Sequence, residues 1–151
     1  MFPILCFGQS ELYENYNRCN CSIDIPTEMT LNVYESTFDY CDAEIILKNG
    51  QRVIELHSLN ISKFEFDNIE DLFNAAVIKH SKNPNFKLTY KMKSTNYFVI
   101  SGVDNKSGNI IYWKRVVGDN FISDLRFDYP FSLKKEVEPF IGKIAKSFES
   151  Y

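Results

Sequence analysis

The chain has 151 residues, the usual size of one globular domain, with 44% hydrophobic and 25% charged residues. This composition excludes a disordered or collagen-like chain, and no apolar run approaches the roughly 18 to 20 residues of a membrane-spanning helix. A net charge of −3 disfavours a dedicated nucleic-acid-binding protein. The aromatic content of 15% favours β-strands, because aromatic rings fit a pleated, half-buried surface.

The first eight residues, MFPILCFG, resemble the end of a signal peptide, with Cys6 and Gly8 as the small residues before a cleavage site. We expect residues 1–8 to be a signal-peptide remnant, residues 9–20 an N-terminal extension and residues 21–151 a single domain. The protein is then exported, either to the periplasm or to the medium. If residues 1–8 are instead an ordinary apolar strand or tail, the protein is cytoplasmic.

Three further cysteines, Cys19, Cys21 and Cys41, fit an exported protein with one disulfide. The bond would join Cys41 to either Cys19 or Cys21, since alternation along a strand lets only one of these two reach Cys41. Three reduced thiols are the alternative. A zinc site with His57 or His80 is not expected, because the C-x-C spacing differs from that of usual zinc-ligand pairs.

In the first half of the chain, alternating residues predict short strands at 21–26 and 29–34. A hairpin follows, with strands at 43–48 and 51–59 on either side of Asn49-Gly50. This dipeptide is typical of a type I′ turn, in which both central residues have positive φ.

Two amphipathic helices are expected. The first begins after Asn68 as its N-cap and ends at Asn83-Pro84. The second extends from about 132 to 148, and Pro139 either kinks it or occupies the first position of its regular part. The first helix carries one apolar stripe, made of Ile69, Leu72, Phe73, Ala76 and Val77.

In the second half, strands are predicted at 86–92, 97–100, 110–117 and 121–129, joined by tight turns into an antiparallel meander. The element order is therefore β-β-β-β-α-β-β-β-β-α. This order predicts an α+β fold with a largely antiparallel β-sheet and two covering helices.

Basic residues gather on the strand at 86–92, where we expect Lys87, Lys91 and Lys93 to share one face. Together with Lys114 and Arg115 they form the expected basic binding strip. Residues 1–81 carry 5 basic and 13 acidic side chains, and residues 82–151 carry 12 basic and 7 acidic ones. We expect these two halves to interleave in one sheet and neutralise each other.

Several segments carry a resemblance to a known family: Ser22–Pro26, Tyr97–Gly102, Ile111–Lys114, Leu125–Pro130 and Ile141–Phe148. They resemble the PsbP-like superfamily, in particular small exported bacterial proteins with a DcrB/PsbP-type domain. The match covers roughly residues 22–30 and 86–148 and is made by core and turn residues. The resemblance implies a PsbP-like α/β/α sandwich that is not an enzyme.

No catalytic, cofactor or metal site is expected. Ser101-Gly102 lacks the first glycine of a nucleophile elbow, and Asp124 and Asp128 flank Arg126, which favours ion pairs over a catalytic carboxylate pair. We expect a monomer or homodimer that binds a protein or a small ligand, with no nucleic acid, no cofactor and no integral membrane segment. The alternatives are a chaperone, adaptor or immunity-type protein of a bacterial secretion or toxin system, and an enzyme with an unrecognised site.

Overall fold

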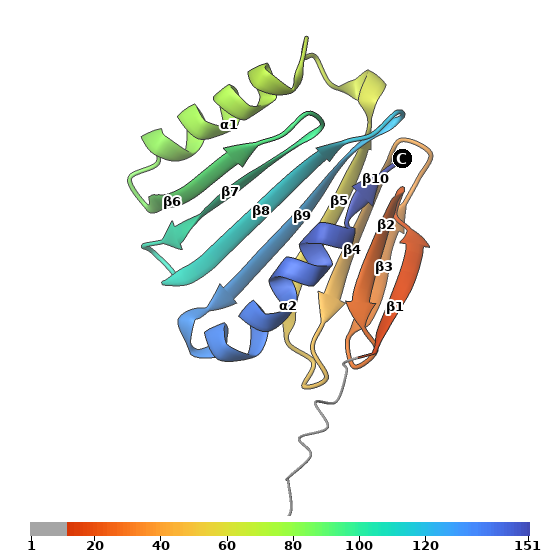
Figure 1. The fold of residues 1–151 in the computed structure, drawn as a ribbon, viewed down its shortest axis with the longest axis vertical. Helices are drawn as coiled ribbons and strands as arrows, with labels where there is room; N and C mark the ends of the chain where they lie inside the picture. Colours follow the sequence, from red (N-terminus) through yellow and green to blue (C-terminus); the bar gives the residue numbers. More distant parts are fainter. Residues whose placement is uncertain (1–11) are drawn as a thin grey trace, which may run out of the picture.

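The structure is a computed structural model that describes residues 12–151, so the expected signal-peptide remnant and Cys6 lie outside the described residues. The strands form a seven-stranded sheet, in the order β3-β4-β5-β9-β8-β7-β6, and a three-stranded sheet, β1-β2-β10 (Figure 1). Each pair of neighbouring strands in the described part of the chain is antiparallel. The strands are β1 Tyr13–Arg18, β2 Cys21–Pro26, β3 Thr30–Ser36, β4 Tyr40–Ile46, β5 Arg52–Asn60, β6 Phe86–Lys93, β7 Tyr97–Asp104, β8 Asn109–Val117, β9 Phe121–Pro130 and β10 Glu149–Ser150.

The two helices lie on opposite faces of the seven-stranded sheet. Helix α2 (Lys134–Ser147) and the three-stranded sheet cover one face, and α1 (Ile69–Lys82) packs on the other face, along β6 and β7 (Figure 1). Short 3-10 turns, Ile61–Lys63 and Phe131–Leu133, precede the two helices. The expected α+β fold with two helices and a largely antiparallel sheet is confirmed. Within residues 12–151, neither helix has the length or the apolar character needed to cross a membrane.

The main core lies between the large sheet and the layer formed by α2 and the small sheet. Its largest fully buried side chains include Ile23, Ile45, Ile54, Phe127 and Phe148. A second, smaller core lies under α1 and has Ala76, Phe98 and Ile100 as its buried members. Since α1 buries few side chains, its attachment to the sheet is weaker than that of α2.

The helix ends follow from local sequence. The Asn68 side chain accepts a hydrogen bond from the Asp71 backbone N–H at 3.0 Å, which confirms Asn68 as the N-cap of α1. Pro139 lies inside α2, five positions after its first residue, so of the two expected placements the regular part of the helix begins before the proline.

The expected N-terminal extension, 9–20, is corrected by the structure, because β1 lies within it and pairs with β2 along its whole length. The β1–β2 turn has positive φ at both central residues, Cys19 (59°) and Asn20 (57°). This is the backbone pattern of a type I′ turn, formed here without glycine. The mostly polar sequence of β1 and the absence of a glycine explain why this hairpin gave no signal.

The prediction of a hairpin at Asn49-Gly50 is confirmed, but the turn type is wrong. Only Gly50 has positive φ (86°), and the Gly50 N–H bonds the Leu47 carbonyl at 2.8 Å. The loop therefore has three residues, a type I turn closed by a glycine in the left-handed conformation. The Asn49 side chain stabilises it by accepting a bond from the Gln51 N–H at 2.9 Å.

A β-bulge in β6 changes which side chains share a face. The register with β7 shifts between Leu88 and Tyr90, so Leu88 lies opposite Gly102 and Lys91 opposite Ile100. Phe86 and Leu88 consequently pack under α1, whereas Tyr90 and Met92 lie on the other face. A regular alternation without the bulge would place all four on one face and Lys87, Lys91 and Lys93 on the other.

Candidate functional site

A cleft of about 470 Å³ opens between α1 and the strands β5, β9 and β8. The apolar stripe of α1 packs along β6 and β7. On the same face of the sheet, β8, β9 and β5 carry charged side chains, against which an apolar helix stripe cannot pack, so a space remains there. The helix contributes Leu72, Ala75, Ala76, Lys79 and His80 to the lining, and the strands contribute Glu55, His57, Ile111, Trp113, Arg115, Asp124 and Arg126.

Four ionisable side chains form one row across the sheet. The register places Asp42 opposite His57, His57 opposite Asp124, and Asp124 opposite Arg115, so one residue comes from each of β4, β5, β9 and β8. The Asp42 carboxylate is 2.5 Å from Nδ1 of His57. Acidic and basic groups alternate along the row, and each carboxylate has a cationic or imidazole partner.

The Arg115 guanidinium is held on three sides. Its Nε and one Nη donate to the two oxygens of Asp124, both at 2.7 Å, in a bidentate pair. Its Cζ lies 5.0 Å from the centroid of the Trp113 ring and 5.3 Å from that of Phe64. Because both partners of the ion pair are only 17% exposed, the pair is a fixed part of the cleft wall.

Trp113 forms the aromatic part of the cleft floor. Its ring contacts Phe98 edge-on at 5.2 Å and the imidazole of His80 at 5.6 Å. Burial lowers the pKa of His80, and the positive charges of Lys79 and Arg126 lower it further. His80 is therefore neutral at pH 7 and adds a weakly polar, flat surface beside Trp113.

His57 lines the cleft and bonds Asp42, which is outside the lining, in an acid–imidazole pair of the kind that positions a general base. A general base of this kind acts on a nucleophile such as a serine or cysteine side chain, or on a water molecule. The cleft lining, as far as the described residues form it, holds no hydroxyl or thiol side chain. Among residues 12–151, no cluster of three or more His, Cys, Asp or Glu side chains has the geometry of a metal site.

The expected basic binding strip is not formed. Lys91, Lys93 and Arg115 lie on the α1 face, where Lys93 pairs with Glu70 of α1 and Arg115 with Asp124. Lys87 and Lys114 lie on the opposite face, and Lys114 is buried against the end of α2. The bulge in β6 and the alternation of β8 account for this division.

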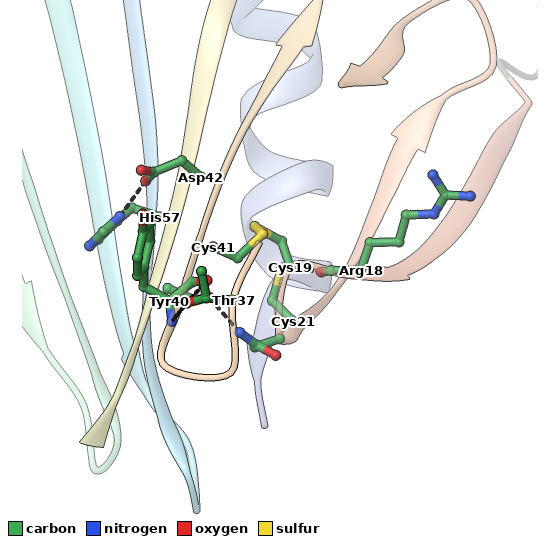
Figure 2. Close-up of a disulfide and its surroundings, with 10 residues drawn as sticks. Arg18, Cys19, Cys21, Thr37, Tyr40, Cys41, Asp42 and His57 are labelled. Atoms are coloured by element: carbon green, nitrogen blue, oxygen red, sulfur yellow. Dashed lines mark hydrogen bonds and ion pairs between the residues drawn. A yellow bond between two sulfur atoms is a disulfide. The ribbon is translucent and has the colours of Figure 1, made fainter. Parts of the chain in front are cut away.

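The three cysteines within residues 12–151 form a disulfide, Cys19–Cys41, and a free, buried thiol, Cys21. The disulfide joins the β1–β2 turn to β4, and Asp42 and His57 lie on the other side of β4 (Figure 2). The Cys21 thiol donates to the Arg18 carbonyl, with a sulfur–oxygen distance of 3.2 Å. Burial raises the pKa of Cys21 to about 12, so this thiol does not ionise at neutral pH.

The sequence predicted a strand at 51–59, which contains His57, and ion pairs for Asp124. The ion pair exists, but the partner of Asp124 is Arg115 on β8, and Arg126 pairs with Asp128. The cleft itself was missed. The one local signal was the spacing of two between Trp113 and Arg115 and between Asp124 and Arg126, which places each pair on one face of its strand. The register between β8 and β9 then brings the two pairs together.

Comparisons with known proteins agree with the architecture. A scan against protein-family models and a search of the curated proteins find no match. Among solved structures, the chain is similar to the type of domain found in PsbP. The solution structure of cyanobacterial PsbP (CyanoP) from Synechocystis sp. PCC 6803 superposes with a TM-score of 0.59 at 10% sequence identity, covering 97% of this chain and 96% of that chain. The chain therefore has a PsbP-like fold, as its sequence resemblance implied.

Proposed function

We propose that this chain is an exported, non-catalytic binding domain that holds a small ligand in the cleft between α1 and strands β5, β9 and β8. The observation that carries the proposal is the cleft itself, whose volume of about 470 Å³ falls in the range of small-molecule sites. Its lining combines an apolar helix face with fixed polar groups on the strands, which is the usual make-up of a ligand site.

The construction of the cleft favours binding over catalysis. Arg115 and Asp124 bind each other, Arg115 also contacts the Trp113 ring, and His57 is bonded to Asp42. These side chains therefore present a preformed surface. The acid–imidazole pair lacks a neighbouring hydroxyl or thiol in the described lining to activate. A preformed polar wall whose described lining has no hydroxyl or thiol side chain suits recognition of a ligand.

The cleft can be blocked without disturbing the core. Ala75 lines the cleft from α1 and is exposed, so Ala75→Phe places a ring in the cleft. Trp113, the single tryptophan of the chain, reports on the cleft through its indole N–H signal in 15N-resolved NMR spectra. We expect naphthalene-2-carboxamide, -carboximidamide or -carboxylate to shift this signal saturably, and Ala75→Phe to weaken that binding by about tenfold or more.

The matched control is Asn74→Phe, which adds the same ring to the neighbouring exposed position of α1, outside the cleft lining. It is expected to leave binding unchanged. The proposal of a ligand-binding cleft fails if none of the three probes moves the Trp113 signal. It also fails if both phenylalanine variants weaken binding equally, since binding would then occur elsewhere on α1.

Export is supported by the Cys19–Cys41 disulfide, because such bonds form and persist in oxidising compartments. The expected outcome of cell fractionation is that the chain is found in the periplasm or medium, with the disulfide formed. A cytosolic product that retains residues 1–8 would contradict export and leave the cleft proposal standing.

A chaperone, adaptor or immunity-type protein is the second candidate, and one feature favours it. β3 is an edge strand of the large sheet, and Tyr34 in it and Phe38 just after it are 55% and 86% exposed. An edge of this kind can add a strand from a partner protein. A stoichiometric complex with a protein encoded beside this chain, formed equally well by Ala75→Phe, would favour this candidate over the ligand-binding cleft.

A further inference from the structure

The carboxylates of the cleft lining already have partners within the protein. Both oxygens of Asp124 are occupied by Arg115, and Glu55 faces Arg52 at 3.4 Å. The carboxylates that line the cleft are thus engaged by the protein's own cations. A ligand that brought hydrogen-bond donors would have to compete with these pairs.

Two cationic side chains of the cleft lining, Lys79 and Arg126, have N–H groups that bind no other described residue. Within residues 12–151, the Lys79 ammonium makes no hydrogen bond or ion pair. Arg126 contacts Asp128 through one Nη at 3.1 Å and is 46% exposed, so its remaining N–H groups are available to a ligand. Both residues line the cleft near Trp113: Arg126 lies opposite Trp113 in the strand register, and Lys79 precedes His80, whose ring lies 5.6 Å from that of Trp113.

The side chains that line the cleft carry a net positive charge. Three cationic side chains, Lys79, Arg115 and Arg126, face two anionic ones, Glu55 and Asp124. The excess is one positive charge. A ligand with one negative charge would neutralise it, and a dianion would meet the field of the two lining carboxylates.

The apolar surface lies beside these cations. The register places Trp113 directly opposite Arg126 on the neighbouring strand. Leu72 and Ala76 of α1 face the same space. A flat ring lying on Trp113 therefore has cationic donors next to its edge.

We propose that the cleft binds a small ring-bearing monocarboxylate, with its ring on Trp113 and its carboxylate at Lys79 and Arg126. This inference rests on the proposed ligand-binding function and adds the chemical class of the ligand. Binding is driven by burial of the ring against Trp113 and α1, and the charge-assisted hydrogen bonds set the selectivity.

The test compares isosteric probes on the full chain by the shift of the Trp113 indole signal. Naphthalene-2-carboxylate is expected to bind about tenfold or more tightly than naphthalene-2-carboxamide and naphthalene-2-carboximidamide, which keep the ring and its shape. Naphthalene-2,6-dicarboxylate is expected to bind more weakly than the monocarboxylate. Added salt should reduce the advantage of the carboxylate, because it screens exposed charges.

Two variants separate the role of charge from the role of the fold. Lys79→Gln is expected to weaken the carboxylate about tenfold and to leave the carboxamide unchanged. The matched control, Lys82→Gln, removes a charge from the last turn of the same helix outside the cleft lining and should change neither affinity.

The outcomes distinguish this inference from the function on which it rests. If the carboxamide binds as tightly as the carboxylate and Ala75→Phe blocks both, the cleft binds ligands but the carboxylate preference is overturned. Equal losses in Lys79→Gln and Lys82→Gln overturn it as well, since the effect would be one of overall charge. If no probe moves the Trp113 signal, the ligand-binding function itself fails.

Discussion

Replacing both Cys19 and Cys41 by serine should lower the free energy of unfolding by about 3 kcal/mol. The bond joins residues 22 positions apart, and its absence restores conformational freedom to the unfolded segment between them. The native turn also loses its restraint, since Cys19 has a φ of 59° that L-residues adopt at a cost of roughly 1 kcal/mol. Urea denaturation followed by Trp113 fluorescence measures the difference.

The control for this prediction is Cys21→Ala, which removes the free thiol and leaves the disulfide intact. Adding a reductant should destabilise Cys21→Ala and the original chain alike and leave the double serine variant unchanged. Digestion after glutamate leaves Cys19 and Cys21 on one peptide and Cys41 on another, and fragmentation of the linked peptides between Cys19 and Cys21 identifies which of the two is bonded to Cys41. A bond from Cys41 to Cys21, or a reductant-insensitive transition in the original chain, would contradict the assignment.

The pairing illustrates how far the sequence could predict this part of the fold. The sequence predicted a bond from Cys41 to either Cys19 or Cys21 and left the choice open. The choice depends on the turn, because Cys19 lies outside β2, at a left-handed position of the β1–β2 hairpin. The turn residues Cys19 and Asn20 include no glycine, so the local sequence does not predict this hairpin.

The strands and helices themselves were largely predictable, because hydrophobic periodicity and caps are local properties. The sequence predicted which side chains share a face of the sheet only in strands whose register is regular. In β9 alternation places Asp124 and Arg126 together, as the structure does. In β6 one bulged residue moves Tyr90 to the face opposite Leu88, and the expected strip of lysines disappears with it.

The cleft depends on the order of strands in the sheet, which no local pattern contains. The two halves of the chain do not interleave as expected: β3, β4 and β5 are contiguous, and so are β9, β8, β7 and β6. They meet where β5 pairs with β9. At this junction the acidic half places Glu55 beside Arg126 of the basic half. The sheet topology thus explains why acidic and basic side chains lie together in the cleft.

On the opposite face, Lys114 joins β8 to the end of α2. It is 7% exposed, and its ammonium donates to the carbonyls of Ala145 at 2.6 Å and Phe148 at 3.2 Å. Ala145 is in the last turn of α2, where carbonyls have no partner within the helix. The ammonium also lies 4.7 Å from the centre of the Tyr97 ring.

Lys114→Met keeps the apolar stem and removes the donors, so it is expected to lower the free energy of unfolding by about 2 kcal/mol. Burial lowers the pKa of Lys114, and the neutral amine still has two N–H groups for the two carbonyls. In the pH range between the lowered pKa and the ordinary value near 10.5, the native state binds fewer protons than the unfolded state. The original chain should therefore gain stability over Lys114→Met as pH rises through this range.

Denaturation curves of both proteins at neutral and alkaline pH measure these differences. The matched control is Lys146→Met, an exposed position in the last turn of α2, for which a change within about 0.5 kcal/mol is expected. Equal destabilisation by the two methionine variants would mean that net charge matters and the capping bonds do not. A difference between the original chain and Lys114→Met that narrows toward pH 10 would show that burial does not lower the pKa of this lysine. Both results would contradict the view that β8 holds the end of α2 through a single buried amine.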